Sequence, residues 1–477
     1  MGKLFGTDGI RGVVNAGLDA TLAYQVGLAA AVVMAKETGK SRPQVAIGKD
    51  TRISSDLLES ALIAGLCSAG ADVLHLGVVP TPAVAFLTVE MGADAGIVIS
   101  ASHNPFEHNG IKIFNSQGYK LRDALEGEIE EIILSGQLPA LKTHGDLGRV
   151  IHKDEEETRA YIDHLVSTVD TDFAGMRIVV DCANGAASAT APGLFARFPK
   201  LHADILHAQP DGININNGCG STHMEDLKAA VVKGGYDLGL AYDGDADRFL
   251  AVDEKGEDID GDQIMAACAR VLQAEGKLNG NAMVGTVMSN MGLHIFAKEN
   301  GMELHCTPVG DRNVLEKMLE HDFVIGGEQS GHTIFRAYAT TGDGELTSLQ
   351  FLQVLHRSGK KASELVADCR RYPQVLINLP VESKEKKEEI MAAQALKDAG
   401  VKIMGTQPEG IRLAEDREYF RERMIALNIR QPESGTARSL EEAVELGRRI
   451  GYPVMVRPSF VLGGRGMEVI YDEENLK

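Results

Sequence analysis

The chain has no cysteine pair spaced as CxxC among its six cysteines, which are scattered along 477 residues. This spacing indicates neither a zinc site nor a disulfide framework. Free thiols persist in a reducing compartment, so we expect a cytoplasmic protein. The six are Cys67, Cys182, Cys219, Cys268, Cys306 and Cys369.

Long apolar runs are also lacking. The longest run near the start, residues 26–35, has about ten residues, whereas a helix needs roughly 20 to span a bilayer. We interpret it as a buried helix. The opening MGKLFG has Gly6 where a myristoylation signal has Ser or Thr, and no secretory segment follows. The sequence therefore predicts no membrane partner and no targeting signal.

Positive charge is scarce, because 48 Lys and Arg residues stand against 68 Asp and Glu residues, for a net charge of -20 at pH 7. Nucleic acids attract proteins through clustered Lys and Arg, so no nucleic-acid partner is expected. An anionic small molecule would need a local basic pocket.

Apolar strand-like runs alternate with amphipathic helical stretches through most of the chain. Residues 44–48, 73–77 and 96–100 have the strand pattern, and residues 55–69 have the helical pattern. The 52 glycines fall mostly at the ends of apolar runs, where tight turns are made. These patterns predict the α/β class.

Changes in composition divide the chain into several units. A polar passage at residues 142–157 precedes a new strand that begins at Met176, and a helix at residues 263–275 opens a third unit. We predict three related mixed α/β domains around a central cleft, then an incomplete fourth domain and a different α/β tail. The predicted ranges are 1–150, 151–256, 257–368, 369–391 and 392–477.

Ser102 follows directly on the apolar run GIVIS, in the loop ASHNPFEHNGIK. Open α/β sheets build their sites at the carboxyl ends of strands, so this position favours a function. A lone Ser in a loop is more often a turn or capping residue. His103 and Lys112 change that balance, because they place proton-transfer groups near the hydroxyl.

Asp243, Asp245 and Asp247 alternate within YDGDADRF. In an extended segment their carboxylates would point the same way and hold one hard cation, for which we expect Mg²⁺. An EF-hand is rejected, because position 6 of that loop requires Gly and is Arg248 here. Arg248 favours a site that handles cation and phosphate together, and a solvated acidic turn is the alternative.

The segment GGEQSGH combines three glycines with Glu328, Ser330 and His332, whose polar groups suit sugar hydroxyls. A strand followed by a turn would explain the glycines but not the polar residues between them. We interpret the segment as a sugar-binding loop.

Two further loops offer groups for a phosphate. GTDGIRG near the start brings Thr7 and Arg11 into a glycine-flanked loop that can lie against an anion. Asp311 and Arg312 follow Gly310 in the second loop. Arg312 adds a basic side chain to the site there, or else forms a surface ion pair.

Three of these segments together resemble the α-D-phosphohexomutase superfamily over about residues 1–390. ISASHNP resembles its phosphoserine loop, DGDADR its metal loop and GEQSGH its sugar-binding loop. GTDGIRG, and Gln329 in place of Met within the sugar loop, are more similar to the phosphoglucosamine mutases than to phosphomannomutase/phosphoglucomutases.

The resemblance implies a role for each predicted site residue. The catalytic residues would be Ser102, His103, Lys112 and Arg248. The Mg²⁺ ligands would be Ser102, Asp243, Asp245 and Asp247. The substrate-binding residues would be Thr7, Arg11, Asp311, Arg312, Glu328, Ser330 and His332.

The implied reaction converts glucosamine 6-phosphate, a small phosphosugar, into glucosamine 1-phosphate. Phosphorylated Ser102 donates its phosphate, a 1,6-bisphosphate turns over in the cleft, and the 6-phosphate returns to Ser102. Such transfer depends on positioning and on charge stabilisation by a cation and basic side chains. Glucosamine 1,6-bisphosphate or a similar compound would be the activator, no nucleotide is expected, and the assembly is left open between a monomer and a homodimer.

The C-terminal part departs from the superfamily. The fourth domain should carry a phosphate-binding loop resembling RPSGTEP, and only its beginning, RYPQVLINLPVESKEKKEEI, is similar here. From about residue 392 the sequence resembles the large chain of carbamoyl-phosphate synthase at the entry to an ATP-grasp unit. Arg457 and the loop of Gly463, Gly464 and Gly466 would lie near ATP phosphates there. The rest of that unit would follow residue 477, so we expect no independent ATP chemistry.

QPESGTAR, residues 431–438, is similar to the missing SGT loop. Because its surroundings follow the synthase pattern, we interpret this likeness as a coincidence. The sequence thus predicts a chimeric chain with a mutase of impaired activity. The alternatives are phosphomannomutase/phosphoglucomutase activity, a carbamoyl-phosphate synthase fragment, or a non-catalytic fusion.

Overall fold

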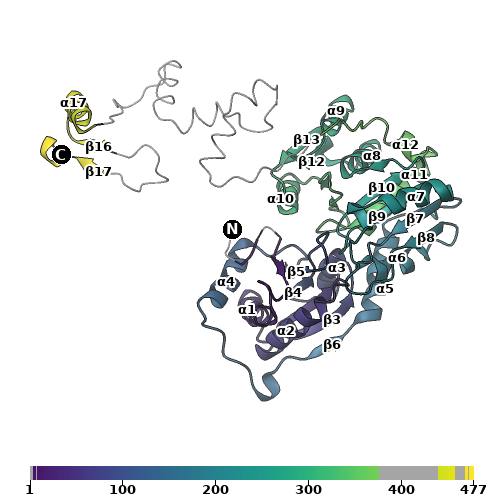
Figure 1. Ribbon diagram of the computed structural model, residues 1–477, viewed down its shortest axis with the longest axis horizontal. Coiled ribbons are helices and arrows are strands. Elements are labelled where there is room, and N and C mark those ends of the chain that lie inside the picture. The colour runs from purple at the N-terminus through teal and green to yellow at the C-terminus, as the bar shows by residue number, and fades with distance from the viewer. Residues whose placement is uncertain (1–3, 7, 375–438, 457–467, 471, 477) are drawn as a thin grey trace. The chain divides into compact units, whose positions relative to one another are not determined.

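The computed structural model describes residues 4–6, 8–374, 439–456, 468–470 and 472–476. The chain forms two compact units, Met1–Gln374 and Val375–Lys477 (Figure 1). Helices and strands alternate along the first unit, as the sequence pattern predicted.

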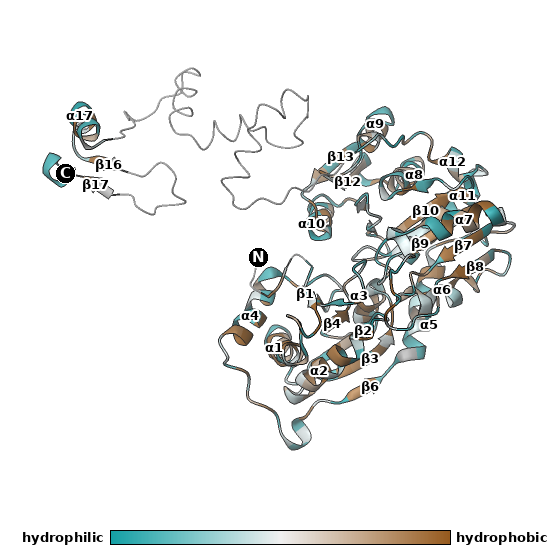
Figure 2. Ribbon diagram, viewed as in Figure 1, coloured by the Kyte–Doolittle hydropathy of each residue, from teal (hydrophilic) through white to brown (hydrophobic). Residues whose placement is uncertain are grey.

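The first sheet has six strands in the order β1-β5-β4-β2-β3-β6. Strands β2, β3, β4 and β6 pair in parallel, whereas β1 and β5 add an antiparallel edge. Figure 2 shows hydrophobic residues along β3 and β4, and every residue of β4 is buried. The bounds are β1 Ile10–Val13, β2 Gln44–Lys49, β3 Asp72–Val78, β4 Ala95–Ile99, β5 His108–Asn115 and β6 Val150–His152.

Four helices accompany this sheet. Gly27 of α1 and Gly65 of α2 meet at backbone contact, since a Cβ on Gly27 would lie 2.3 Å from the carbonyl oxygen of Leu62. The close crossing of α1 and α2 therefore requires glycine. The bounds are α1 Ala20–Thr38, α2 Ser55–Ser68, α3 Thr81–Glu90 and α4 Asp123–Leu134, with a 3-10 turn at His144–Asp146.

The second sheet has the order β11-β10-β9-β7-β8. Its strands β7, β8 and β9 are parallel, so their carboxyl ends lie at one edge, where loops with polar side chains follow. The strands are β7 Arg177–Asp181, β8 His202–Leu206, β9 Leu238–Tyr242, β10 Phe249–Asp253 and β11 Asp258–Ile259. The helices are α5 Asp154–Ser167, α6 Ala187–Phe195 and α7 Glu225–Gly234, with a 3-10 turn at Gly220–Thr222.

The third sheet has the order β13-β12-β14-β15. Its strands are β12 Ala282–Thr286, β13 Glu303–Thr307, β14 Ile325–Gly327 and β15 Thr333–Phe335. Its helices are α8 Gly261–Ala274, α9 Met291–Glu299, α10 Asp311–His321, α11 Gly344–Ser358 and α12 Ala362–Leu365, with a 3-10 turn at Asn279–Asn281.

Two elements connect the predicted domains. Strand β6 pairs with β3, so the first sheet includes residues up to His152. Helix α11 packs against β9, β10 and α5 as well as against β15 and α8. The second and third sheets therefore share one hydrophobic core. The predicted boundaries themselves, including the start of a fourth domain at residue 369, stay predictions.

The second unit is described in part. Helix α17, Leu440–Ile450, precedes β16, Val454–Val456, which pairs antiparallel with β17, Glu468–Ile470, and α18 spans Glu473–Leu476. The predicted ATP-phosphate loop with Arg457, and the segment 431–438, lie outside the described residues.

Within the described ranges of both units, no helix combines the length and the apolar character that crossing a membrane demands.

Candidate active site

Ser102 lies in the loop that follows β4, as predicted, and its backbone is in the left-handed region with φ of 52°. Neighbouring groups hold this conformation. The Ser102 N–H donates to Ser100 Oγ at 2.9 Å, and the Ser102 carbonyl accepts from Arg52 and Asn216 at 2.9 Å each. A backbone fixed in this way presents the side chain in one direction.

The Ser102 hydroxyl points at the three-aspartate loop. Its Oγ donates to Asp243 Oδ2 at 2.6 Å, and His103 Nδ1 lies 3.4 Å from Ser102 Oγ. Burial, followed by the charges of Arg248 and Arg11, lowers the pKa of His103 to about 4. The imidazole is therefore neutral at physiological pH and has a nitrogen free to accept a proton.

The three aspartates meet through a tight turn and not through an extended segment, which corrects the expectation from their alternation. Ala246 has a φ of 54° within this turn. One oxygen from each of Asp243, Asp245 and Asp247 lies within 4.8 Å of the others. At Gly244 a Cβ would lie 2.6 Å from the Ser102 carbonyl oxygen, so glycine allows the two loops to touch.

These carboxylates fit a hard cation. Asp243 and Asp245 are 0% and 1% exposed, and Oδ1 of Asp245 and of Asp247 finds no hydrogen-bond donor in the described part of the chain. Burial, and then the charges of Asp247 and Asp245, raise the pKa of Asp243 well above its usual range. Buried oxygens without donors are what a divalent cation with oxygen ligands would satisfy.

Lys112 in β5 supplies a cation beside this cluster. Its Nζ lies 2.9 Å from Asp245 Oδ2, 3.3 Å from Asp8 Oδ2 and 3.6 Å from Asp247 Oδ2. Burial opposes its charge, but the carboxylates of Asp245, Asp8 and Asp247 outweigh burial and raise the pKa of Lys112. Lys112 is therefore an ammonium ion held against the predicted metal loop.

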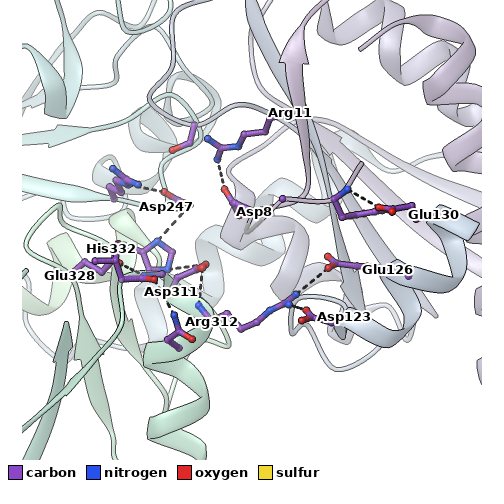
Figure 3. A pocket seen from close by; sticks show the side chains of 18 residues that line it. Asp8, Arg11, Asp123, Glu126, Glu130, Asp247, Asp311, Arg312, Glu328 and His332 are labelled. Carbon is purple, nitrogen blue, oxygen red and sulfur yellow. Dashed lines mark hydrogen bonds and ion pairs between the residues drawn. The ribbon is translucent and has the colours of Figure 1, made fainter. Parts of the chain in front are cut away.

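One pocket collects most of the predicted site residues from all three sheets (Figure 3). Ser102 and Asp247 line it together with Asp123, Glu126 and Glu130 of α4. The predicted residues that line it are Arg11, Ser102, Asp247, Arg248, Asp311, Arg312, Glu328 and His332. The remaining predicted residue of the first loop, Thr7, lies outside the described residues.

The arginines at the pocket are paired with carboxylates. Arg11 pairs with Asp8, and Figure 3 shows the two side chains facing each other. Arg312 pairs with Asp123 and donates to the Leu121 carbonyl at 2.6 Å, so it bridges α10 to the first sheet's layer. Each guanidinium keeps further N–H groups that can serve an anionic ligand.

The predicted sugar loop is arranged around Glu328. Its Oε1 accepts from the Gly310 N–H at 3.0 Å, and its Oε2 accepts from Ser330 Oγ at 3.3 Å. His332 accepts from the Gly342 N–H through Nε2 at 3.0 Å, and its Nδ1 lies 3.6 Å from Asp247 Oδ2. The sugar loop and the aspartate loop are thus in direct contact.

Three residues of the site escaped the sequence reasoning. Asp8 and Lys120 pair with each other, and Lys120 also lies 2.5 Å from Asp311. Arg52 is fully buried and donates to the carbonyls of Ser102 and Asn104. Asp8 belongs to the GTDGIRG motif and could have been predicted from it, but no sequence signal marks Lys120 or Arg52.

Comparison with family models gives three matches in the first unit. The phosphoglucomutase/phosphomannomutase alpha/beta/alpha domains I, II and III match residues 2–139, 159–256 and 260–372. The ATP binding domain of the carbamoyl-phosphate synthase L chain matches residues 416–477.

Two solved structures share the fold. A phosphoglucomutase/phosphomannomutase family protein from Burkholderia thailandensis is 27% identical with a TM-score of 0.66, over 76% of this chain and 79% of that chain. N-acetylphosphoglucosamine mutase from Aspergillus fumigatus, solved with GlcNAc-6P and magnesium, is 16% identical with a TM-score of 0.55, over 80% of this chain and 82% of that chain.

A phosphoglucosamine mutase from Acetivibrio thermocellus is 50% identical over 446 residues, which cover 90% of this chain and 98% of the relative. Because the match covers 90% of this chain, the similarity extends past residue 391. The start of the synthase-like tail at residue 392 stays a prediction. Identity at this level over almost the whole relative is decisive for the family. The chain belongs to the phosphoglucosamine mutase family, within the α-D-phosphohexomutase superfamily of isomerases.

Proposed function

We propose that this chain interconverts glucosamine 6-phosphate and glucosamine 1-phosphate through a phosphoserine at Ser102 and a 1,6-bisphosphate intermediate. The observation that carries the proposal is the Ser102 hydroxyl, which is 2.6 Å from Asp243 Oδ2 in a pocket lined by three arginines. Phosphoryl transfer needs this combination of a nucleophile, a cation site and basic groups.

The three aspartates are proposed to hold Mg²⁺, with an oxygen of phosphorylated Ser102 as a further ligand. Carboxylate oxygens are the ligands that this ion prefers, and the set contains no nitrogen or sulfur donor. When bound, the ion supplies positive charge against the phosphoryl oxygens. The magnesium in the fungal N-acetylphosphoglucosamine mutase complex is consistent with this choice.

His103 and Lys112 are proposed to manage the protons and the charge around Ser102. His103 Nδ1 is close enough, at 3.4 Å, to exchange a proton with the hydroxyl as substrate binding tightens the site. Lys112, as an ammonium group 2.9 Å from Asp245 Oδ2, keeps the carboxylate cluster compact and offsets its charge.

The outer pocket is proposed to bind the phosphosugar. Arg11 and Arg312 would contact the phosphosugar and Arg248 would assist the phosphoryl transfer at Ser102, because guanidinium groups match the geometry of phosphate oxygens. Glu328 and Ser330 would accept from and donate to sugar hydroxyls; the remaining substrate-binding candidates are Thr7, Asp311 and His332. Glucosamine 1,6-bisphosphate, or a similar bisphosphate, would prime the serine.

A reducing cytoplasm is the proposed location, supported by six cysteines that are all free thiols. The homodimer stays a prediction, which light scattering on the purified chain would check.

The test is turnover of glucosamine 1-phosphate in a coupled assay with a trace of glucosamine 1,6-bisphosphate, compared with glucose 1-phosphate and mannose 1-phosphate. The proposal requires the highest kcat/KM for the amino sugar. A preference for either of the other two sugars would contradict the proposed substrate and support phosphomannomutase/phosphoglucomutase activity instead. No turnover of any of the three would contradict the mutase proposal itself.

A further inference from the structure

A second cluster of metal-type ligands lies in the second sheet's layer, and it shares no residue with the aspartate loop. Asp181 ends β7, His207 directly follows β8, and Cys219 precedes the 3-10 turn at Gly220–Thr222. Strands β7 and β8 are parallel neighbours with Asp181 opposite Leu206, so their carboxyl ends bring these segments together.

One ligand atom from each of the three residues lies within 4.8 Å of the others. Asp181 and Cys219 are both 0% exposed, while His207 is half-buried. The cluster therefore has a closed inner side and one side open to solvent, by which an ion can enter.

The three ligand atoms converge on one point. His207 Nδ1 lies 3.0 Å from Asp181 Oδ2, so the imidazole and the carboxylate form a close pair. Cys219 Sγ lies 3.8 Å from Asn184 Nδ2 and 4.0 Å from the Asn214 carbonyl, and these weak sulfur contacts leave it able to bind an ion. An imidazole nitrogen, a carboxylate oxygen and a sulfur that converge within this distance can share one cation.

Other contacts hold the ligands in place. The two carboxylate oxygens of Asp181 accept from the N–H groups of Ala183 and Gly220 at 2.9 Å each, which fixes the carboxylate and leaves further lone pairs. Asp226 Oδ2 lies 3.7 Å from His207 Nε2, on the far side of the ring.

We propose that Asp181, His207 and Cys219 form a binding site for a divalent transition-metal ion of the Zn²⁺ type. Mg²⁺ prefers oxygen ligands alone, whereas a mixed set of one thiolate, one imidazole and one carboxylate suits Zn²⁺ or Co²⁺. Three protein ligands leave the fourth tetrahedral position to water. On binding, the Cys219 thiol loses its proton to solvent as the sulfur–metal bond forms.

The site is connected to the phosphoserine loop through Asn216. The Asn216 N–H donates to the Ala183 carbonyl at 2.9 Å, and its side chain donates to the carbonyls of Ser102 and Asn104 at 2.9 and 3.1 Å. Asp181 lies two residues before Ala183, and Cys219 lies three residues after Asn216. An ion bound by Cys219 and Asp181 would therefore restrain both segments that this hydrogen bond joins. It would therefore order the segment that supports Ser102.

The experiment uses the full chain, reduced, freed of metal with a chelator and then supplied with excess Mg²⁺ to fill the aspartate loop. Co²⁺ is titrated in while the absorption spectrum is recorded. We expect one equivalent to produce a near-ultraviolet thiolate-to-Co²⁺ band together with visible bands of tetrahedral intensity, and one equivalent of Zn²⁺ to remove both. Absence of the near-ultraviolet band at saturating Co²⁺ would overturn the proposal.

Two cysteine variants assign the band. Cys219→Ser should lose it, and Cys306→Ser should keep it, although Cys306 is exposed and has its own histidine, His294, 3.9 Å away. The reverse result would overturn the assignment. If Cys219→Ser fails to fold, as judged by circular dichroism, His207→Gln gives the same test, because loss of one of three ligands should weaken Co²⁺ binding about tenfold or more. Unchanged Co²⁺ affinity in His207→Gln would reject the site.

Discussion

At the scale of single residues, the site depends on side chains that are buried although they are polar. Ser102 is 1% exposed and Lys112 is 2% exposed, and both contact the aspartate loop directly. Burial of a polar group costs free energy unless a partner compensates it. A substitution that removes one partner should therefore lower the free energy of unfolding as well as the activity.

Ser102→Ala is expected to reduce mutase turnover to background, because a methyl group can neither carry nor transfer a phosphoryl group. Phosphate incorporation from labelled glucosamine 1,6-bisphosphate, followed by mass spectrometry, measures the same loss directly. Ser60→Ala is the matched control, since Ser60 is an exposed residue of α2. Turnover of Ser102→Ala at the level of the control would remove Ser102 from the mechanism.

Asp245→Asn is expected to raise the Mg²⁺ concentration for half-maximal activity by about tenfold or more, because a neutral amide replaces a charged ligand. The amide oxygen can still accept from Thr81 Oγ1, which donates to Asp245 Oδ2 at 2.7 Å, so the fold should persist. Asp172→Asn, at an exposed carboxylate, is the control. Identical Mg²⁺ titrations of the two variants would argue against a metal ligand at Asp245.

At the scale of elements, most residues of α11 are buried. Its N-cap Asp343 accepts from the Leu346 N–H at 2.9 Å, and Tyr161 of α5 donates to the same carboxylate at 2.9 Å. Glu345 in its first turn is 0% exposed, accepts from Thr190 Oγ1 at 2.7 Å, and has no partner for Oε2 within the described residues. The start of α11 therefore carries a carboxyl group with incomplete hydrogen bonding.

This carboxyl group should make stability depend on pH. Burial, and then the charge of Asp343, raise the pKa of Glu345 from 4.5 to about 8. In the unfolded chain Glu345 loses its proton near pH 4.5, whereas in the folded chain it keeps the proton up to about pH 8. Its contribution to stability is thus full below pH 4.5, falls across this window and is lost above it.

Glu345→Gln is expected to flatten the fall of the apparent Tm between pH 5 and pH 8, by a few degrees for a contribution on the order of a few kcal/mol. Differential scanning calorimetry across this range measures it. Glu131→Gln, at an exposed residue of α4, should leave the pH profile unchanged. A Glu345→Gln profile parallel to the unsubstituted one would show that Glu345 ionises normally in the fold.

At the scale of the whole molecule, three sheets supply one pocket, and the chain then continues into a segment that matches a different family at residues 416–477. In the first unit, Lys120 pairs with Asp8, which precedes β1, and with Asp311 at the start of α10. Asp247, which follows β9 of the second sheet, lies beside His332, which precedes β15 of the third sheet. Because each region contributes only part of the pocket, activity depends on the arrangement of all of them.

Replacing residues 392–477 with a complete phosphohexomutase fourth domain is expected to raise kcat/KM for glucosamine 6-phosphate by about a hundredfold. A phosphate held at the distal end of the substrate orients the reacting end, and each 1.36 kcal/mol of transition-state stabilisation changes the rate about tenfold. Both chains are assayed under the same conditions. Equal kcat/KM values would show that this chain has its own distal phosphate site, and Ser434→Ala and Thr436→Ala within QPESGTAR would then locate it.

The sequence by itself determined the α/β class, the strand-end position of Ser102 and the identity of the three aspartates. Each of these depends on residues that are adjacent along the chain: an apolar run followed by a polar loop, or three carboxylates in five positions. Local order of this kind survives in the fold because strands end where their apolar runs end. The predicted roles of these residues stay predictions until the variants are measured.

Only the tertiary structure decided which distant residues meet. The left-handed backbone of Ala246 lies in a turn that brings the three aspartates together. From their alternation we had expected an extended segment. Lys120 contacts Asp311, and the Cys219 thiol lies near the Asp181 carboxylate, although nothing in the spacing along the sequence predicted either approach. The physical reason is that strand pairing and close helix packing, set by side-chain burial over the whole unit, bring carboxyl ends of separate strands to one edge.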